Sequence, residues 1–280
     1  MIPDPSLVAR LRAAGCVFAE EEAALLVEAA DSPASLEPLV ARRLAGEPLE
    51  TILGWASFAG LRVACAPGVF VPRRRTELMV RLAVARLRPD GPDEVTSATA
   101  AQRAAERGAE RGAGLRPVHR HVLDLGCGTG AIGAAVAANA PGVDVWAVDV
   151  DPAAVDCARR NLPPERVLLG DLYEPLPPDL RFDLILANAP YVPTDAIALM
   201  PPEARDHEHR VALDGGRDGL DVQRRAIAGA AGRLAPGGAI LVETSRRQAE
   251  PTAALMEDAG LLPSLHTDDE IGGTVVLGRG

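Results

Sequence analysis

The sequence predicts an α/β protein with a Rossmann-like, mostly parallel sheet of seven strands. The first observation is the stretch 121–133, HVLDLGCGTGAIG, in which an apolar strand runs through a glycine-rich turn into small, helix-compatible residues. The second is the alternation of strand-like and helix-like segments from residue 121 onward, which is typical of parallel strands joined by helical crossovers. The third is a pair of apolar segments, 261–266 and 274–277, which we interpret as antiparallel edge strands.

The glycine-rich turn is the predicted centre of a ligand site. Gly126, Gly128 and Gly130 let the backbone bend sharply and a ligand approach it closely, and the helix that follows presents free N–H groups. The spacing formally matches the dinucleotide fingerprint, but it also fits the turn that holds S-adenosylmethionine (AdoMet). Asp124 favours AdoMet, because a carboxylate there can lie near the cationic amino-acid end of that cofactor. Cys127 contributes its backbone, and a purely structural turn is the remaining alternative.

Two further acids follow strands of the predicted sheet. Asp149 ends the second strand and, with Val150 beside it, is placed to bind the ribose hydroxyls of a nucleoside. Its alternative role is a helix cap. Asp171 and Leu172 end the third strand, where we expect a hydrogen bond to the adenine amine and packing against the ring. The alternative for Asp171 is an ordinary turn aspartate.

A polar tetrapeptide, Asn188-Ala189-Pro190-Tyr191, follows the fourth predicted strand, 182–187. In open α/β sheets, ligands bind outside the carboxyl ends of the strands, near the point where the strand order reverses. We therefore predict that these four residues are catalytic and that Asn188 also contacts the cofactor. A structural turn is the alternative.

Composition narrows the function classes. The net charge of −10 argues against non-specific binding to nucleic acid, and all 29 basic residues are arginine, so no catalytic lysine exists. The four cysteines form no CxxC pair, which disfavours a disulfide framework or a zinc site. The sequence shows neither a long apolar run nor a signal-peptide pattern, so we expect a cytoplasmic protein.

The chain before residue 121 divides into segments of different character. Residues 1–48 predict a helical bundle, 49–72 a β-hairpin linker, and 73–280 the main domain, in which the biased stretch 89–118 reads as a flexible insertion. The predicted helices of the bundle are 6–14, 19–30 and 33–44. The predicted strands of the linker are 52–55, 58–63 and 69–72.

Several motifs occur in a defined order along the chain. They are Gly46-Glu47-Pro48-Leu49 with Ile52-Leu53-Gly54, Pro67-Gly68-Val69-Phe70-Val71-Pro72-Arg73 with Thr76-Glu77, DLGCGTGAIG, NAPY, and Ala212-Leu213-Asp214-Gly215-Gly216 with Asp218-Gly219-Leu220. Together they resemble the protein-(glutamine-N5) methyltransferase family of the HemK/PrmC type, which methylates the glutamine of the GGQ motif in peptide chain release factors. The resemblance covers nearly the whole chain.

The resemblance implies a class I AdoMet-dependent methyltransferase fold, with AdoMet as cofactor and a release factor-like protein as partner. It implies that Phe70, Arg73 and Thr76 close over the methionine end of the cofactor and that the bundle 1–48 recognises the substrate. It also implies a monomer that binds neither nucleic acid directly nor a membrane.

Two departures from the family pattern indicate a divergent branch. Ala189 stands where the family has its first proline, although alanine still supplies the backbone carbonyl that this position contributes. Arg74-Arg75 stands where the family usually has a proline and an acid. His207-Glu208-His209 formally has a metal-binding spacing, but we assign Glu208 to the glutamate that precedes ALDGG in the family and predict no metal.

The expected chemistry follows from the acceptor nitrogen. An amide lone pair is delocalised into its carbonyl, so the nitrogen is a poor nucleophile. We expect the Asn188 side-chain oxygen and the Ala189 carbonyl to accept hydrogen bonds from the two amide N–H groups, while Tyr191 packs on substrate or cofactor. The alternatives are an N-methyltransferase of the same fold acting on a small molecule or another protein amide, a nucleic-acid adenine methyltransferase, and an NAD-binding or catalytically silent adaptor.

Overall fold

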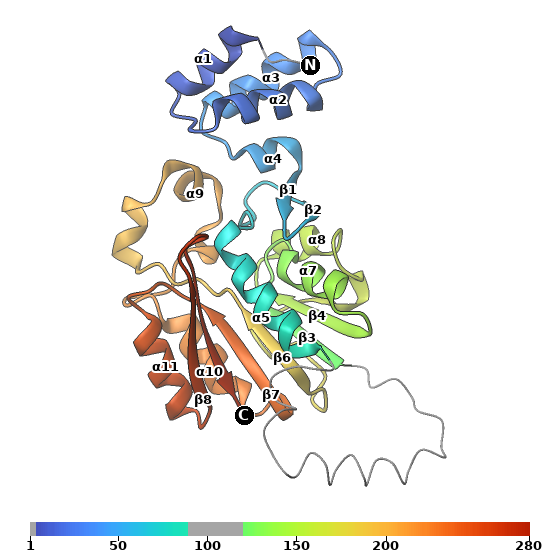
Figure 1. The fold of residues 1–280 in the computed structure, drawn as a ribbon, viewed down its shortest axis with the longest axis vertical. Helices are drawn as coiled ribbons and strands as arrows, with labels where there is room; N and C mark the ends of the chain where they lie inside the picture. Colours follow the sequence, from blue (N-terminus) through green and yellow to red (C-terminus); the bar gives the residue numbers. More distant parts are fainter. Residues whose placement is uncertain (1–3, 89–119) are drawn as a thin grey trace.

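The computed structural model describes residues 4–88 and 120–280, which form a small helical part and a larger α/β part (Figure 1). The predicted insertion, 89–118, lies outside the described residues. The helices are α1 (Pro5–Ala13), α2 (Ala19–Ala29), α3 (Pro33–Leu44), α4 (Leu49–Leu53), α5 (Glu77–Leu87), α7 (Ala131–Asn139), α8 (Pro152–Ala158), α9 (Pro202–His207), α10 (Asp221–Ala230) and α11 (Ala249–Asp258). The strands are β1 (Trp55–Phe58), β2 (Leu61–Ala64), β3 (Arg120–Leu125), β4 (Val143–Asp149), β5 (Val167–Leu169), β6 (Phe182–Ala187), β7 (Leu234–Glu243), β8 (Leu262–Asp268) and β9 (Gly273–Arg279).

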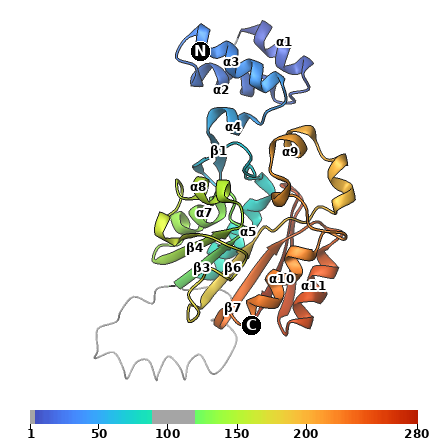
Figure 2. The same ribbon diagram turned by 180° about the vertical axis from the view of Figure 1, so that it is seen from behind.

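The larger part is a three-layer sandwich around a seven-stranded sheet of order β5-β4-β3-β6-β7-β9-β8. All neighbours are parallel except β9, which is antiparallel to both β7 and β8. Alternate residues of the strands face opposite layers. Leu184 and Leu186 of β6 pack with α5 and α7, and Ile185 and Ala187 pack with α10 and α11, which lie beside β7 in Figure 2. The predicted seven-stranded sheet is confirmed, and its strand order reverses between β3 and β6.

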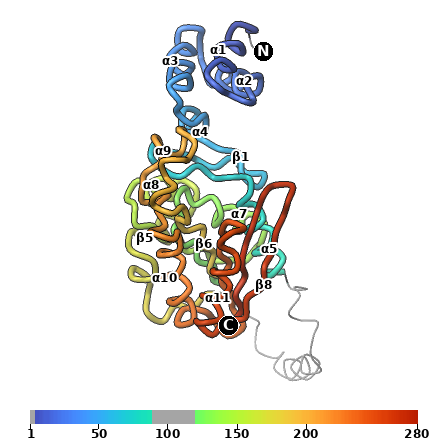
Figure 3. The backbone as a smooth tube through the Cα atoms, turned by 90° about the vertical axis from the view of Figure 1, so that its left-hand side faces the viewer, coloured from blue at the N-terminus to red at the C-terminus, as the bar shows by residue number. Residues whose placement is uncertain are grey.

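The helical part has a core of its own. Ser32 begins α3 as a capping box with Ser35, which satisfies backbone N–H groups at the helix start. Arg43 of α3 is buried and forms ion pairs with Glu22 of α2 and Glu203 of α9, each at 2.6 Å. Figure 3 shows α4 and α9 between the bundle and the sheet. The core residues of the bundle are Leu7, Leu11, Cys16, Ala19, Ala23, Leu26, Val40 and Ile52.

The linker differs from its prediction in three places. The expected strand 58–63 contains a turn, because Ala59 and Gly60 connect β1 to β2. The segment 52–55 was expected to be a strand, but Ile52 belongs to helix α4 and packs into the bundle core, because a short apolar run fits either element. Strands β1 and β2 do form the antiparallel hairpin, with Trp55 opposite Ala64. The segment 69–72, expected to be a strand, is irregular chain, and an isolated parallel bridge between Gly68 and Glu208 lies just before it.

Helices α9 and α10 lie between β6 and β7 along the chain. Helix α10 ends at Ala230, shortly before β7 begins at Leu234. Helix α9 had no counterpart among the predicted elements. Within residues 4–88 and 120–280, no helix combines the length and the apolar character that crossing a membrane requires.

Candidate active site

A cavity of about 330 Å³ lies at the carboxyl ends of the parallel strands, where the strand order reverses. The glycine turn, the ends of β4 and β6, the loop after β5 and the segment 68–76 all contribute to its walls. The structure brings most of the predicted site residues to this one cavity. They are Phe70, Thr76, Gly126, Cys127, Gly128, Asp149, Val150, Asp171, Leu172, Asn188, Ala189, Pro190 and Tyr191.

Asp149 is tied to the glycine turn by backbone hydrogen bonds. Its Oδ2 accepts from the N–H of Gly128 at 2.8 Å, and its Oδ1 accepts from the N–H of Asp151 at 2.9 Å. Burial raises the pKa of Asp149 from its ordinary value, and the backbone donors act in the opposite direction. Each carboxylate oxygen keeps a further lone pair for a ligand hydroxyl. Capping of α8 falls instead to Asp151, whose side chain accepts from the N–H of Ala153.

Asp171 and Leu172 follow β5 at the same end of the cavity. The Asp171 Oδ2 atom lies 2.5 Å from Nη2 of Arg225 in α10, and Arg225 also lines the cavity. Leu172 has a backbone φ of 48°, which is uncommon for a residue with a Cβ and turns its side chain toward the cavity wall. An acid and an apolar side chain therefore lie together, as adenine recognition requires.

Three predicted cofactor contacts lie outside the cavity wall, and the structure gives each another role. Arg73 forms an ion pair with buried Glu208 at 2.5 Å. The guanidinium carbon of Arg73 lies over the Phe70 ring, 5.0 Å from its centre. Gly130 begins α7 with a φ of 74°, and a Cβ there would lie 2.9 Å from the Leu162 side chain, so helix packing requires glycine.

Asp124 is the third of these residues. It lies fully buried beneath the turn, and its Oδ2 accepts from the N–H of Gly133 at 2.8 Å, while Oδ1 has no partner among the described residues. Burial raises the pKa of Asp124 to about 7, with the Gly133 hydrogen bond acting against this shift and nearby Asp149 adding to it. Asp124 therefore holds the start of α7 and does not line the cavity.

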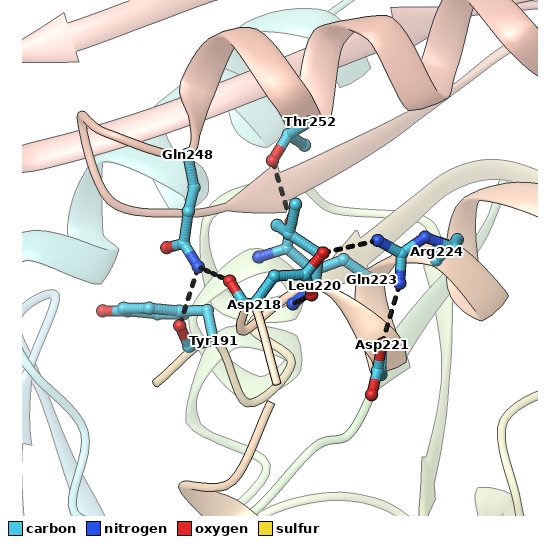
Figure 4. A network of polar contacts seen from close by, with 8 residues as sticks. All are labelled: Tyr191, Asp218, Leu220, Asp221, Gln223, Arg224, Gln248 and Thr252. Carbon is cyan, nitrogen blue, oxygen red and sulfur yellow. Dashed lines mark hydrogen bonds and ion pairs between the residues drawn. The ribbon is translucent and has the colours of Figure 1, made fainter. Parts of the chain in front are cut away.

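The backbone of Asn188–Tyr191 is held by the segment 212–221. Val192 and Asp214 form a parallel bridge, and the Gln248 side-chain amide donates to the carbonyls of Tyr191 at 2.9 Å and Asp218 at 3.2 Å (Figure 4). A Cβ on Gly219 would lie 2.4 Å from the Tyr191 carbonyl oxygen. This close approach explains why glycines recur in the ALDGG and DGL motifs.

A second set of contacts reaches the side chain of Asn188 from the opposite wall. Its Nδ2 donates to Oγ1 of Thr76 at 3.4 Å, and Glu243, which ends β7, is buried. Arg75 donates from Nε to Glu243 Oε1 at 3.2 Å, and its guanidinium lies 5.8 Å from the centre of the Tyr191 ring. Burial raises the pKa of Glu243, which the Thr76 and Arg75 contacts oppose.

Sequence reasoning missed Glu243, Gln248 and Arg225, and within the arginine triplet 73–75 it assigned only Arg73 to the cofactor. Glu243 carried a usable signal, because it ends a strand in the same way as Asp149. In the triplet, the structure places only Arg75 on the cavity wall, while Arg74 is exposed.

The histidines beside Glu208 do not assemble a metal site. The Nδ1 of His209 lies 2.6 Å from Asp151 Oδ2, whereas Glu208 accepts from the N–H of Val71 at 3.1 Å and from Arg73. In the part of the chain that the structure describes, no group of three His, Cys, Asp or Glu side chains is arranged to hold a metal ion. Glu208 thus fixes the segment that leads into the cavity wall at Thr76.

Comparison with known proteins identifies the family. A family model described as the methyltransferase small domain matches residues 114–200. The release factor glutamine methyltransferase of Geobacter sulfurreducens is 37% identical over 249 residues, which are 88% of this chain and 77% of that protein. The enzyme of the same name from Bordetella pertussis is 39% identical over 232 residues, which are 81% of this chain and 76% of that protein. The chain belongs to the release factor glutamine methyltransferase family.

A solved structure supports the fold of this release factor glutamine methyltransferase family member. It is the T. thermophilus 16S rRNA N2 G1207 methyltransferase in complex with AdoMet and guanosine, with a TM-score of 0.53 and 23% identity. The match covers 80% of this chain and 49% of that chain, so the similarity concerns the fold alone. The predicted family, the class I methyltransferase fold, the enzyme class and AdoMet as cofactor are confirmed.

Proposed function

We propose that this chain transfers the methyl group of AdoMet to the side-chain amide nitrogen, N5, of a glutamine in the GGQ motif of a peptide chain release factor. The observation that carries the proposal is the meeting of Asn188–Tyr191 with the glycine turn and Asp149 in one cavity. An amide substrate requires two acceptors for its N–H groups beside the methyl donor. Relatives named for this activity support the same substrate.

The residues of the cavity fit AdoMet. Asp149 suits the ribose hydroxyls, and Asp171 with Leu172 suits adenine. Phe70 and Thr76 line the same cavity, and Thr76 accepts a hydrogen bond from Asn188, so we assign the methionine end to this side. The volume of about 330 Å³ is within the range of sites for ligands of this size. When bound there, AdoMet supplies an electrophilic methyl group on a cationic sulfur atom.

The residues of the chain bind and orient the amide. The side-chain oxygen of Asn188 and the carbonyl of Ala189 accept hydrogen bonds from its two N–H groups. These bonds fix the nitrogen lone pair in one direction and favour a less conjugated nitrogen. The same oxygens stabilise positive charge that develops on the nitrogen during transfer. Tyr191 supplies an apolar wall for the substrate.

The domain roles follow from the contacts between the two parts. We assign substrate recognition to residues 1–48, linkage to 49–72 and catalysis to 73–280. The ion pair between Arg43 and Glu203 supports this assignment, because it joins the bundle to the segment beside the cavity. A net charge of −10 supports a monomer that binds a protein and makes no direct contact with nucleic acid.

The test is mass spectrometry of a release factor incubated with the enzyme and AdoMet. We expect the mass increment of one methyl group on the glutamine of the GGQ peptide. A release factor with glutamine changed to glutamate serves as the control and should gain nothing. Binding of AdoMet by calorimetry without any such increment on the glutamine peptide would contradict the proposed substrate.

A further inference from the structure

Arg75 lies on the cavity wall, and no step of the proposed reaction uses it. We propose that Arg75 is an additional AdoMet-binding residue, whose guanidinium holds the carboxylate at the methionine end of the cofactor. The family usually has an acid near this position, so the resemblance does not imply the contact, which is a property of this chain. The inference rests on AdoMet as cofactor and is independent of the release factor as substrate.

The charged side chains of the cavity wall are unevenly distributed. Asp149 and Asp151 lie at the end of β4, and Asp171 follows β5, so the nucleoside end carries these carboxylates. Two cationic side chains are among the described residues of the wall, Arg75 and Arg225. Arg225 lies at the nucleoside end, where it pairs with Asp171 at 2.5 Å. A carboxylate on the ligand is therefore repelled from the nucleoside end and attracted to Arg75.

The order of the strands separates Arg75 from the adenine site. Along the sheet, β5, which precedes Asp171, is followed by β4, β3, β6 and then β7, which ends at Glu243, the partner of Arg75. An AdoMet molecule with its adenine beside Asp171 and its methyl group beside Asn188 extends across these strand ends. Thr76, which accepts from Asn188 at 3.4 Å, is the next residue after Arg75. Arg75 and the methionine end as we assign it are thus on the same side of the cavity.

The guanidinium of Arg75 is held in place before a ligand binds. Its Nε donates to Oε1 of Glu243 at 3.2 Å, and Glu243 is 1% exposed, so the bond fixes one edge of the guanidinium to the interior. The guanidinium carbon lies 5.8 Å from the centre of the Tyr191 ring, within reach of a cation–π interaction. Gln248 in turn holds the Tyr191 carbonyl (Figure 4). A group that is already held loses less freedom when it binds a ligand.

The bond to Glu243 leaves donors on Arg75 for a ligand. A guanidinium has five N–H groups, and this bond uses the one on Nε. The terminal NH₂ groups can each donate to one carboxylate oxygen, the two-bond geometry for which arginine is suited. The Arg75 side chain is 42% exposed, so a ligand in the cavity can reach it. The backbone N–H groups at the start of α7 are the competing site, but they offer partial charges where Arg75 offers a full one.

Calorimetry with two ligands tests the contact without turnover. S-adenosylhomocysteine keeps the carboxylate, and its decarboxylated analogue carries hydrogen in that place. We expect the wild type to bind S-adenosylhomocysteine about tenfold more tightly than the analogue, the value of a charge-assisted hydrogen bond at a half-exposed site. Arg75→Gln should lose affinity for S-adenosylhomocysteine alone and bind the two ligands within about twofold of each other.

Arg74→Gln is the matched control. Arg74 is the neighbouring arginine of the triplet, but it is exposed, lies off the cavity wall and pairs with Glu270 at 3.7 Å. The control should prefer S-adenosylhomocysteine as strongly as the wild type does. If Arg75→Gln also kept the full preference, the carboxylate would be held at the start of α7 and the proposal would be overturned. Equal loss of affinity for both ligands would overturn it too, because Arg75 would then only shape the wall.

Two further variants protect the test against damage to the fold. Arg75→Gln leaves buried Glu243 without its cationic partner, which destabilises the protein. The double variant with Glu243→Gln removes both charges, so we expect it to unfold at a higher temperature than Arg75→Gln and still to lack the preference. Arg75→Lys keeps the charge without the two-bond geometry and should show an intermediate preference. A double variant that regained the wild-type preference would overturn the proposal.

Methyl transfer separates this inference from the proposed function. In Arg75→Gln we expect the KM for AdoMet to rise about tenfold, while kcat at saturating AdoMet stays within about threefold of the wild type, because Asn188 and Ala189 are untouched. A carboxylate preference that depends on Arg75, with no methyl group on the release factor, would refute the proposed function alone. Methylation of the release factor, with S-adenosylhomocysteine bound equally by wild type and Arg75→Gln, would refute the contact alone.

Discussion

The two ends of the cavity are built in different ways. The ribose side of the nucleoside end comes from one continuous strand–turn–helix–strand unit, in which Asp149 accepts a hydrogen bond from the backbone N–H of Gly128, 21 residues earlier. The transfer end comes from three distant segments, and its contacts join side chains that lie 112 residues apart for Thr76 with Asn188 and 168 apart for Arg75 with Glu243. One end is a local backbone structure and the other depends on the whole fold.

This difference predicts a separation of functions. Backbone groups at the nucleoside end are fixed by the sheet and the start of α7, so side-chain changes there should alter cofactor affinity and little else. At the transfer end the acceptors are oriented by other side chains, so changes to the acceptors should lower kcat while the cofactor still binds. The predictions below test that separation, in order of decreasing effect.

Asn188→Ala should break the transfer end alone. We expect kcat to fall about 10²–10³-fold, the loss associated with one preorganised group at the reacting atoms. The Kd for AdoMet should change no more than about threefold, since the nucleoside contacts remain. Radiolabelled methyl transfer and calorimetry measure the two quantities on the same sample. A loss of affinity as large as the loss of kcat would show that the two ends are not separate.

Asp149→Asn should break the nucleoside end alone. Charge-assisted hydrogen bonds to the ribose are lost, so we expect the Kd for AdoMet to rise about 10–100-fold. At saturating AdoMet, kcat should stay within about threefold of the wild type, because Asn188 and Ala189 are untouched. The 2′-deoxy analogue of S-adenosylhomocysteine is the control. It should bind wild type and variant with similar affinity, and a variant that still discriminates the ribose hydroxyl would refute the assignment.

The same contrast explains what could be predicted from the sequence. Strand β6 and the helices α1, α2 and α3 agree with their predicted bounds within about two residues, because their hydrophobic pattern and their caps are local. The ligand-facing positions of the nucleoside end followed from the same local unit. Helix α4 was misread as a strand because only its contact with the bundle core decides between the two.

The transfer end was only partly predictable. Asn188–Tyr191 could be found because they directly follow β6. The sequence did not show that Arg75, and not Arg73, lines the cavity, because the 3-10 turn Arg74–Thr76 decides which of the two side chains faces it. Glu243 and Gln248 meet this loop only after the sheet has formed, and no spacing in the sequence records that meeting. Asp124 was assigned to the ligand, although its side chain lies beneath the turn.

Asp124 lines neither end of the cavity, so Asp124→Asn should change the stability of the fold. The folded protein holds Asp124 with a pKa of about 7, above its ordinary value of 3.8, so the folded state binds the proton more tightly and stability falls as pH rises from about 4 to 7. The variant does not lose stability as the pH rises, although the N–H groups of its new amide lack good hydrogen-bond acceptors. We expect it to gain about 1–2 kcal/mol over the wild type at pH 8, and progressively less toward pH 4.

Thermal unfolding at a series of pH values measures this effect, with a gain of roughly 2–8 °C expected at pH 8. Asp144, an acid on β4 that is paired with Arg166 at 2.5 Å, provides a control in Asp144→Asn, which should show no such gain. If Asp124→Asn were as stable as the wild type at pH 8 but bound AdoMet tenfold more weakly, Asp124 would contribute to cofactor binding as the sequence predicted.

Ala189→Pro should have the smallest effect and sharpen the account of the transfer end. The role assigned to position 189 is its backbone carbonyl, which proline also has, so we expect kcat to stay within about threefold of the wild type. Proline also restricts Asn188 to extended conformations and lowers the entropy of the unfolded chain, which should raise the free energy of unfolding by up to about 1 kcal/mol. Steady-state methyl transfer and denaturant unfolding measure the two. A tenfold rise in kcat would mean that the ring itself orients Asn188, and the carbonyl would no longer suffice as the reason this position matters.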